Sequence, residues 1–142
     1  MPEEILKYLK TQNVAVLALE MLDGSPHAST VHFAHAENPL VFFFETNRDY
    51  RKSEPLFGKA TTRASLVVGS DEAAMKTLQF DGIAELIKLE EKSLYDSVYF
   101  EKFPKKKEKA NDPKCVFFKF TPTWWRFTDW TAPKGKMILT SQ

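Results

Sequence analysis

The sequence predicts a mainly β fold: a closed or half-closed antiparallel barrel of six or seven short strands with helices at its periphery. Two observations carry this prediction. Apolar runs of strand length recur along the chain between clusters of turn residues, and only short stretches show a helical apolar pattern. No repeat, low-complexity tract or linker divides the 142 residues, so we expect one domain over residues 1–142.

The N-terminal half is predicted to hold a short helix and three strands. Pro2, Glu3 and Glu4 suit the first turn of a helix, where carboxylates meet the positive end of the dipole. Residues 14–21 and 27–35 are β-type runs joined by Asp23-Gly24-Ser25-Pro26, which predicts a hairpin. Residues 40–46 are so continuously apolar that both faces of this third strand should be buried.

The C-terminal half alternates strands and helices. We expect a helical turn within 47–58, capped by Asp49 and ending near Pro55, and a strand over 63–69. The strand pattern of 75–89 is interrupted at Asp81-Gly82, which indicates a bulge. An amphipathic helix over 90–103 follows, and two strands, 115–120 and 124–130, complete the list.

Charge and composition exclude several classes of partner. Formal net charge is +1, from 20 basic and 19 acidic side chains, so we expect no nucleic acid partner. The lysine-rich run 105–109 is predicted to be a solvated loop. The acidic start of the chain differs from a signal peptide, and no apolar run has transmembrane length, so we expect a cytoplasmic protein without a membrane partner.

A candidate phosphate site follows the third strand. The strand delivers Thr46, and a polar turn then places Arg51 and Lys52 next to each other at a possible helix start. A hydroxyl, two cations and backbone N–H groups can together bind a phosphate dianion. From this segment alone, a solvated basic loop is an equally good interpretation.

The order of these segments resembles the pyridoxamine 5′-phosphate oxidase-like FMN-binding split-barrel superfamily. The similarity covers residues 12–90: a strand, the Asp-Gly-x-Pro turn, a second strand, an apolar strand, Thr-Asn-x-x-x-Arg-Lys, and the Gly-x-Ala-Glu stretch 82–85. A weaker similarity covers 115–130. The resemblance implies a six- to seven-stranded antiparallel split barrel that binds FMN.

The resemblance also implies cofactor-binding residues. The strand after the turn would present Ser29, Thr30, Val31 and His32 to the polar edge of the flavin ring. Better-known oxidases have arginine at the position of Ser29. Without that cation, the positive charge near the flavin would depend more on the phosphate-binding residues. Those residues are Thr46, Arg51 and Lys52, and a ring-edge contact would come from Gln79 or Thr77.

The same resemblance implies a homodimer with the flavin at the subunit interface. Trp125, within the cluster that also contains Trp124 and Trp130, would form a ring-stacking wall or pack in the dimer. No metal site is expected. His32 and His35, three residues apart on a predicted strand, should point to opposite faces.

Three cofactor-binding functions remain open from the sequence, and a binding module that uses the lysine run 105–109 is the weakest alternative. The first is an FMN-dependent oxidoreductase that transfers electrons to a small-molecule substrate or O₂. The second is a protein that carries or senses flavin without catalysis, since no catalytic acid, catalytic base or substrate-binding motif is recognisable. The third replaces FMN by a deazaflavin or by haem, with His27, His32 or His35 as the iron ligand.

Overall fold

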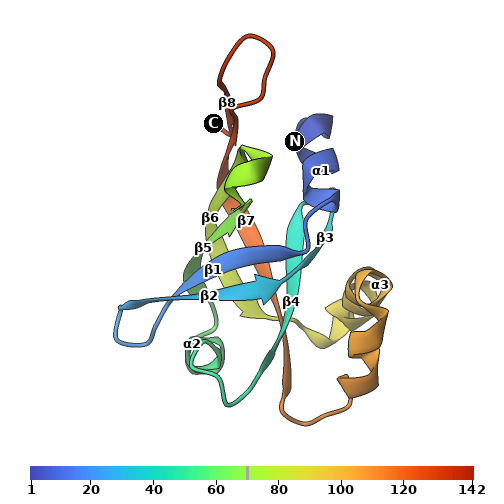
Figure 1. Cartoon of the computed structure of the whole chain (residues 1–142). Coiled ribbons are helices and arrows are strands. Elements are labelled where there is room, and N and C mark those ends of the chain that lie inside the picture. Colours follow the sequence, from blue (N-terminus) through green and yellow to red (C-terminus); the bar gives the residue numbers. More distant parts are fainter. Residues whose placement is uncertain (70) are drawn as a thin grey trace.

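The structure is a computed structural model that describes residues 1–69 and 71–142. Its strands form one antiparallel sheet in the order β2-β1-β5-β6-β7-β4-β3, with β8 paired to β7 (Figure 1). The strands are β1 (Val14–Glu20), β2 (Pro26–His32), β3 (Ala34–Ala36), β4 (Val41–Asn47), β5 (Thr62–Val68), β6 (Lys76–Leu86), β7 (Cys115–Asp129) and β8 (Met137–Thr140). The helices are α1 (Glu3–Lys10), α2 (Ser53–Gly58) and α3 (Lys92–Lys102), with 3₁₀ turns η1 (Glu72–Ala74), η2 (Leu89–Glu91) and η3 (Pro104–Lys109).

This architecture confirms the predicted mainly β split barrel. The curled sheet forms a half-barrel, and the helices lie around it (Figure 1). The predicted hairpin is β1–β2, and its turn is fixed by the Ser25 N–H, which donates to Asp23 Oδ1 at 2.9 Å. Gly24 adopts a φ of +84° in this turn, a conformation that glycine reaches without strain.

The two longest strands bend together at a bulge. The β6–β7 register shifts between Asp81 and Gly82: Asp81 pairs with Trp124, whereas Gly82 pairs with Pro122. Thr123 is the extra residue, and its hydroxyl donates to the Asp81 carbonyl at 3.2 Å. The bulge predicted at Asp81-Gly82 is confirmed, and it gives the sheet its local bend.

The last two predicted strands are one strand, so that prediction was wrong. β7 runs without interruption through Pro122 because this proline lies at the bulge, where a missing N–H does not break the ladder. The C-terminal strand β8 was not predicted.

Two other boundaries differ from the prediction. The run 27–35 is divided at Phe33, whose side chain is buried and whose N–H makes the last bond toward β1, to the Asn13 carbonyl. β3 then pairs with β4 instead. The helix within 47–58 begins only at Ser53, and Asp49 does not cap it, because the Asp49 carboxylate pairs with Lys114 at 2.6 Å.

The strand β4 separates two apolar cores, as its sequence predicted. Phe42 and Phe44 lie in the main core inside the curled sheet, and Phe43 packs on the other side beneath α3. Tyr95 of α3 donates from its hydroxyl to the Phe44 carbonyl at 2.9 Å, so the helix is held to the strand by a buried hydrogen bond.

Gly82 should be intolerant of any side chain. A Cβ at this position would lie 2.2 Å from the Thr121 carbonyl oxygen, so Gly82→Ala must displace backbone. We expect the free energy of unfolding to fall by about 2–3 kcal/mol, measured by denaturant unfolding. Gly24→Ala, where a Cβ would meet no atom within 4 Å, should cost only about 1–2 kcal/mol of backbone strain. Equal losses in the two variants would contradict this account.

Candidate functional site

The strand β2 presents its predicted site residues to two different sides. Val31 is buried in the main core, and Ser29 faces the same side at the open edge of the sheet. Thr30 and His32 alternate with them and are exposed on the outer face. Because β2 pairs only with β1, its other edge stays available to the loop before α2.

The loop before α2 brings Lys52 to Ser29. The Lys52 ammonium lies 3.4 Å from Ser29 Oγ, at the limit of a hydrogen bond. The loop is held in place by Ser53, which is buried and donates from its hydroxyl to the Asn47 carbonyl at 2.8 Å. Ser29, predicted at the flavin ring edge, and Lys52, predicted at the phosphate, are therefore adjacent in space although they are 23 positions apart in the chain.

Lys52 is a half-buried cation without a counter-ion. Among residues 1–69 and 71–142, no carboxylate oxygen lies within 4.0 Å of its ammonium. Burial lowers the pKa of Lys52 because the charged form loses solvation that no neighbour replaces. The ammonium also stands over the ring of Tyr50, 5.6 Å from its centroid. Such a group is poised to accept an anion.

Tyr50, whose ring lies beneath the Lys52 ammonium, also lines a hollow of about 440 Å³ between β4, the end of β2 and η3. The hollow is lined by His32, Thr46, Lys106 and Cys115 as well. Thr46 is 7% exposed, and its hydroxyl has no hydrogen-bond partner in the described part of the chain. An unsatisfied buried hydroxyl at the wall of a hollow fits a ligand that accepts or donates a hydrogen bond there.

The hollow holds neutral imidazole and thiol groups. The pKa of His32 is lowered by burial, and further by the charges of Lys106 and Lys102. Burial also lowers the pKa of Lys106, whose ammonium donates to the Tyr99 hydroxyl at 3.0 Å. The pKa of Cys115 is raised, first by burial and then by the nearby Glu45 carboxylate, so the thiol stays protonated near neutral pH.

Three other predicted residues lie apart from this group. Arg51 is exposed and turned to the β1–β2 hairpin, where the pKa of Asp23 is lowered mainly by hydrogen bonds from Ser25 and to a smaller extent by Arg51. Gln79 is exposed on the outer face. Trp125 is partly buried and packs on the main core, on the opposite side of the sheet from Gln79.

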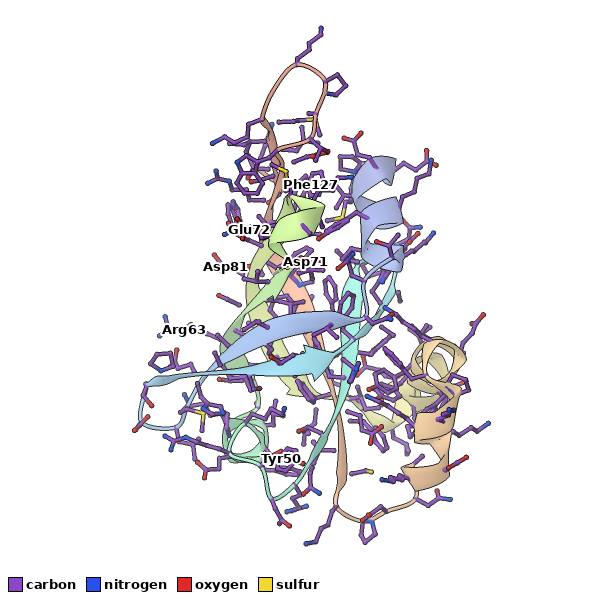
Figure 2. The ribbon with its side chains drawn as sticks, in the orientation of Figure 1. Tyr50, Arg63, Asp71, Glu72, Asp81 and Phe127 are labelled. Carbon is purple, nitrogen blue, oxygen red and sulfur yellow. The ribbon has the colours of Figure 1, made fainter. Side chains whose placement is uncertain are left out.

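Pairing register relates Gln79 to β2. Thr30 is opposite Val16, Val16 is opposite Val67, and Val67 is opposite Gln79. All four therefore lie in one row on the outer face, with Gln79 about 14 Å from Thr30 at the usual strand spacing. Figure 2 shows Tyr50 and Phe127 far apart, near opposite ends of the molecule in this view.

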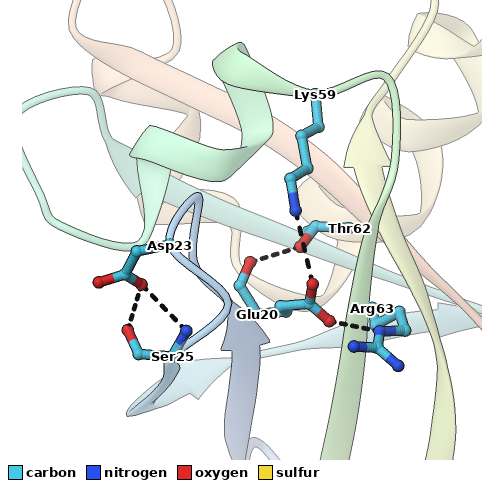
Figure 3. A network of polar contacts seen from close by, with 6 residues as sticks. All are labelled: Glu20, Asp23, Ser25, Lys59, Thr62 and Arg63. Atoms are coloured by element: carbon cyan, nitrogen blue, oxygen red, sulfur yellow. Dashed lines mark hydrogen bonds and ion pairs between the residues drawn. The ribbon is translucent and has the colours of Figure 1, made fainter.

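A polar network fixes the other end of α2. Glu20, at the end of β1, pairs with Arg63 and with Lys59, whose ammonium is 3.5 Å away (Figure 3). The Thr62 hydroxyl donates to the Glu20 carbonyl at 2.6 Å. Lys59 directly follows α2, so the segment that carries Lys52 is held at both ends.

Sequence reasoning missed Lys106 and Glu45. Lys106 belongs to the run 105–109, which was expected to be a solvated loop, but η3 folds it back against Tyr99. The alternation of the strand gave no signal for Glu45, because the contact of its carboxylate is with Cys115, 70 positions further along the chain.

The sequence matches the pyridoxamine 5′-phosphate oxidase family over residues 1–129. The chain belongs to this family. No curated protein matches its sequence. Among the residues described, no helix is both long enough and apolar enough to cross a bilayer, and no group of three or more His, Cys, Asp or Glu side chains is arranged to hold a metal ion.

Solved structures with low sequence identity share the fold. A heme-binding protein from Mycobacterium smegmatis superposes with a TM-score of 0.75 at 16% identity, covering 94% of this chain and 54% of the other. This chain therefore spans about half the length of the Mycobacterium smegmatis protein. HutZ, the heme storage protein of Vibrio cholerae, gives a TM-score of 0.67 at 19% identity, covering 84% and 87%. A Clostridium acetobutylicum protein related to general stress protein 26, of the pyridoxinephosphate oxidase family, gives 0.65 at 16% identity, covering 96% and 91%.

The unpaired ammonium of Lys52 should reduce the stability of the ligand-free protein. Because its pKa is lowered by folding, the unfolded chain binds more protons, and stability rises with pH as the folded-state lysine deprotonates. Lys52→Met keeps the apolar stem and removes the charge, so we expect a higher melting temperature at neutral pH. This gain should shrink as the pH approaches the ordinary lysine pKa of about 10.4.

Lys134→Met is the control, because it changes a lysine that is exposed in the loop before β8. A lower melting temperature for Lys52→Met than for this control would contradict the assignment of Lys52 as an uncompensated cation.

Proposed function

We propose that the chain is an FMN-binding oxidoreductase in which Lys52 and Ser29 hold the phosphate of the flavin. The half-buried, unpaired ammonium of Lys52 beside a hydroxyl is the observation that carries this proposal. A phosphate dianion would restore the solvation that burial removes from the cation. Family membership supports a flavin as the molecule that carries the phosphate.

The neighbouring hollow suits the rest of the cofactor. Thr46 offers an unsatisfied hydroxyl, and His32 contributes an imidazole whose lowered pKa keeps it neutral. When bound, FMN supplies a reversible acceptor of hydride or single electrons for a small-molecule substrate. The residues of this chain bind and orient it. Ring-edge contacts from Thr30, Val31 and Gln79, and a wider role for Arg51 and Trp125, remain predictions.

The outer face of the sheet supports the proposed homodimer. Val14 is 41% exposed, and Val16, Ala18 and Val67 are only half-buried on the same face. An apolar surface of this kind is typical of one that a second subunit covers. We propose that the dimer forms here with the flavin near its interface, and that residues 1–142 act as one FMN-binding domain in the cytoplasm.

Lys52→Ala tests the phosphate assignment directly. The wild type should bind FMN more tightly than riboflavin, because only FMN offers a phosphate to Lys52. Removing one charge-assisted hydrogen bond of about 1.5–3 kcal/mol should weaken FMN by roughly tenfold or more and leave riboflavin unchanged. The measurement is a fluorescence titration of both flavins. If the variant retains the full preference for FMN, the phosphate lies elsewhere.

Val16→Glu tests the dimer. A charge in the middle of the half-buried outer face should give a monomer by light scattering, and should weaken FMN if the flavin lies near the interface. Ile138→Glu, on the exposed strand β8, is the matched control. A Val16→Glu variant that stays dimeric would remove this face from the interface.

Haem is a second candidate ligand of the same hollow. Two structurally similar proteins are named for heme binding or storage, and His32 offers a neutral imidazole at the wall of the hollow. His27 is half-buried on β2, and His35 is enclosed on β3 with Nε2 3.4 Å from Glu37, so both are less suited. The absorption spectrum of the loaded protein decides: a Soret band that His32→Ala abolishes would replace the flavin proposal.

Turnover of NAD(P)H with an acceptor would exclude a pure flavin carrier.

A further inference from the structure

A second hollow is lined by residues of α2, of the start of α3 and of the ends of β6 and β7 that lie near them. Its volume is about 440 Å³, and its floor is made of apolar side chains from the end of β6 and the start of β7. Three cations stand around it: Arg48, Lys88 and Lys92. Cys115 is the one residue that lines both this hollow and the one beside Thr46.

The lining of this hollow contains three cations and no carboxylate. Four other hollows of the described residues each include at least one Asp or Glu. In a chain with nearly equal numbers of acids and bases, the lining of this hollow therefore carries an excess of positive charge.

Two of the cations are held in place by aromatic rings. The Arg48 guanidinium lies 4.2 Å from the centroid of Phe57, and the Lys92 ammonium lies 4.4 Å from that of Phe117. Lys92 also pairs with Asp96, whereas Arg48 has no carboxylate within 4.0 Å in the described chain. A guanidinium stacked on a ring keeps its N–H edge free for a bidentate carboxylate.

The rim of the hollow exposes apolar side chains. Leu89 is 91% exposed and Phe57 is 45% exposed. Their surface and the apolar floor would be removed from water by a ligand with a hydrocarbon body. The volume falls within the range of small-molecule sites.

We propose that this groove binds a medium-chain carboxylate, with the carboxylate on Arg48 and Lys88 and the hydrocarbon chain on the floor below Leu89. The charge of the rim selects the anion, and the floor and exposed rim supply the apolar contact. This site is distinct from the proposed phosphate site, because it shares neither Lys52 nor Ser29 with it; only Cys115 lines both hollows.

Calorimetric titration with decanoate, below the concentration at which it forms micelles, tests the proposal. We expect saturable binding of one decanoate per chain. Arg48→Gln and Lys88→Gln should each weaken it, Arg48→Gln by about tenfold because a charge-assisted contact is lost. Lys134→Gln is the control for a lost surface charge, and circular dichroism verifies that each variant is folded.

Three results would overturn the site. Equal binding of decyltrimethylammonium would show that charge does not select the ligand, and unchanged decanoate affinity in both Gln variants would place it elsewhere. A Leu89→Glu variant that becomes monomeric would identify the groove as a subunit interface. Lys52→Ala should leave decanoate binding unchanged, so a failure of the FMN proposal and a failure of this one are separate outcomes.

Discussion

The curvature of the β6–β7 ladder is the constraint on which the rest of the structure depends. Gly82 lets the backbone of β6 approach Thr121 more closely than any side chain would permit, and Thr123 takes up the extra length of β7. The bend occurs in the two longest strands, at the middle of the sheet. The curled sheet brings β2 and β4, which are distant in strand order, into contact. The loop after β4 can then place Lys52 on β2.

The electrostatic character of the site is clearest when Lys52 is compared with three other partly buried lysines. Lys119 is enclosed by Glu85 and Glu91, and Lys102 donates to the Gln12 carbonyl at 2.5 Å. Lys106 has the Tyr99 hydroxyl at 3.0 Å. Lys52 has only the Ser29 hydroxyl at 3.4 Å, and the nearest polar partner of each of the other three lysines is closer. Burial also lowers the pKa of Lys102, to about 8, but that ammonium has a carbonyl acceptor. A buried charge without a partner is costly, and a bound anion is the simplest compensation.

The fold could be predicted from local signals, while parts of the site could not. Turn clusters, apolar runs and the interruption at Asp81-Gly82 define most strands, because these patterns depend on neighbouring residues. The continuation of β7 through Pro122 depends on its partner Gly82, which no local pattern reveals. Lys52 was predicted from the segment 46–52 and Ser29 through a resemblance, but their contact is a consequence of the curled sheet, which no local pattern indicates. The burial of Lys106 required η3 to fold back, which a run of lysines does not indicate.

The most direct measurement is the pKa of Lys52 followed by NMR of its labelled side-chain amine, with and without FMN. In the free protein the account predicts a pKa below that of an exposed lysine, because burial is not compensated. Adding FMN should raise this pKa, and riboflavin should not. A pKa already at the ordinary value in the free protein, or one that FMN leaves unchanged, would contradict the claim that Lys52 is an anion-binding group.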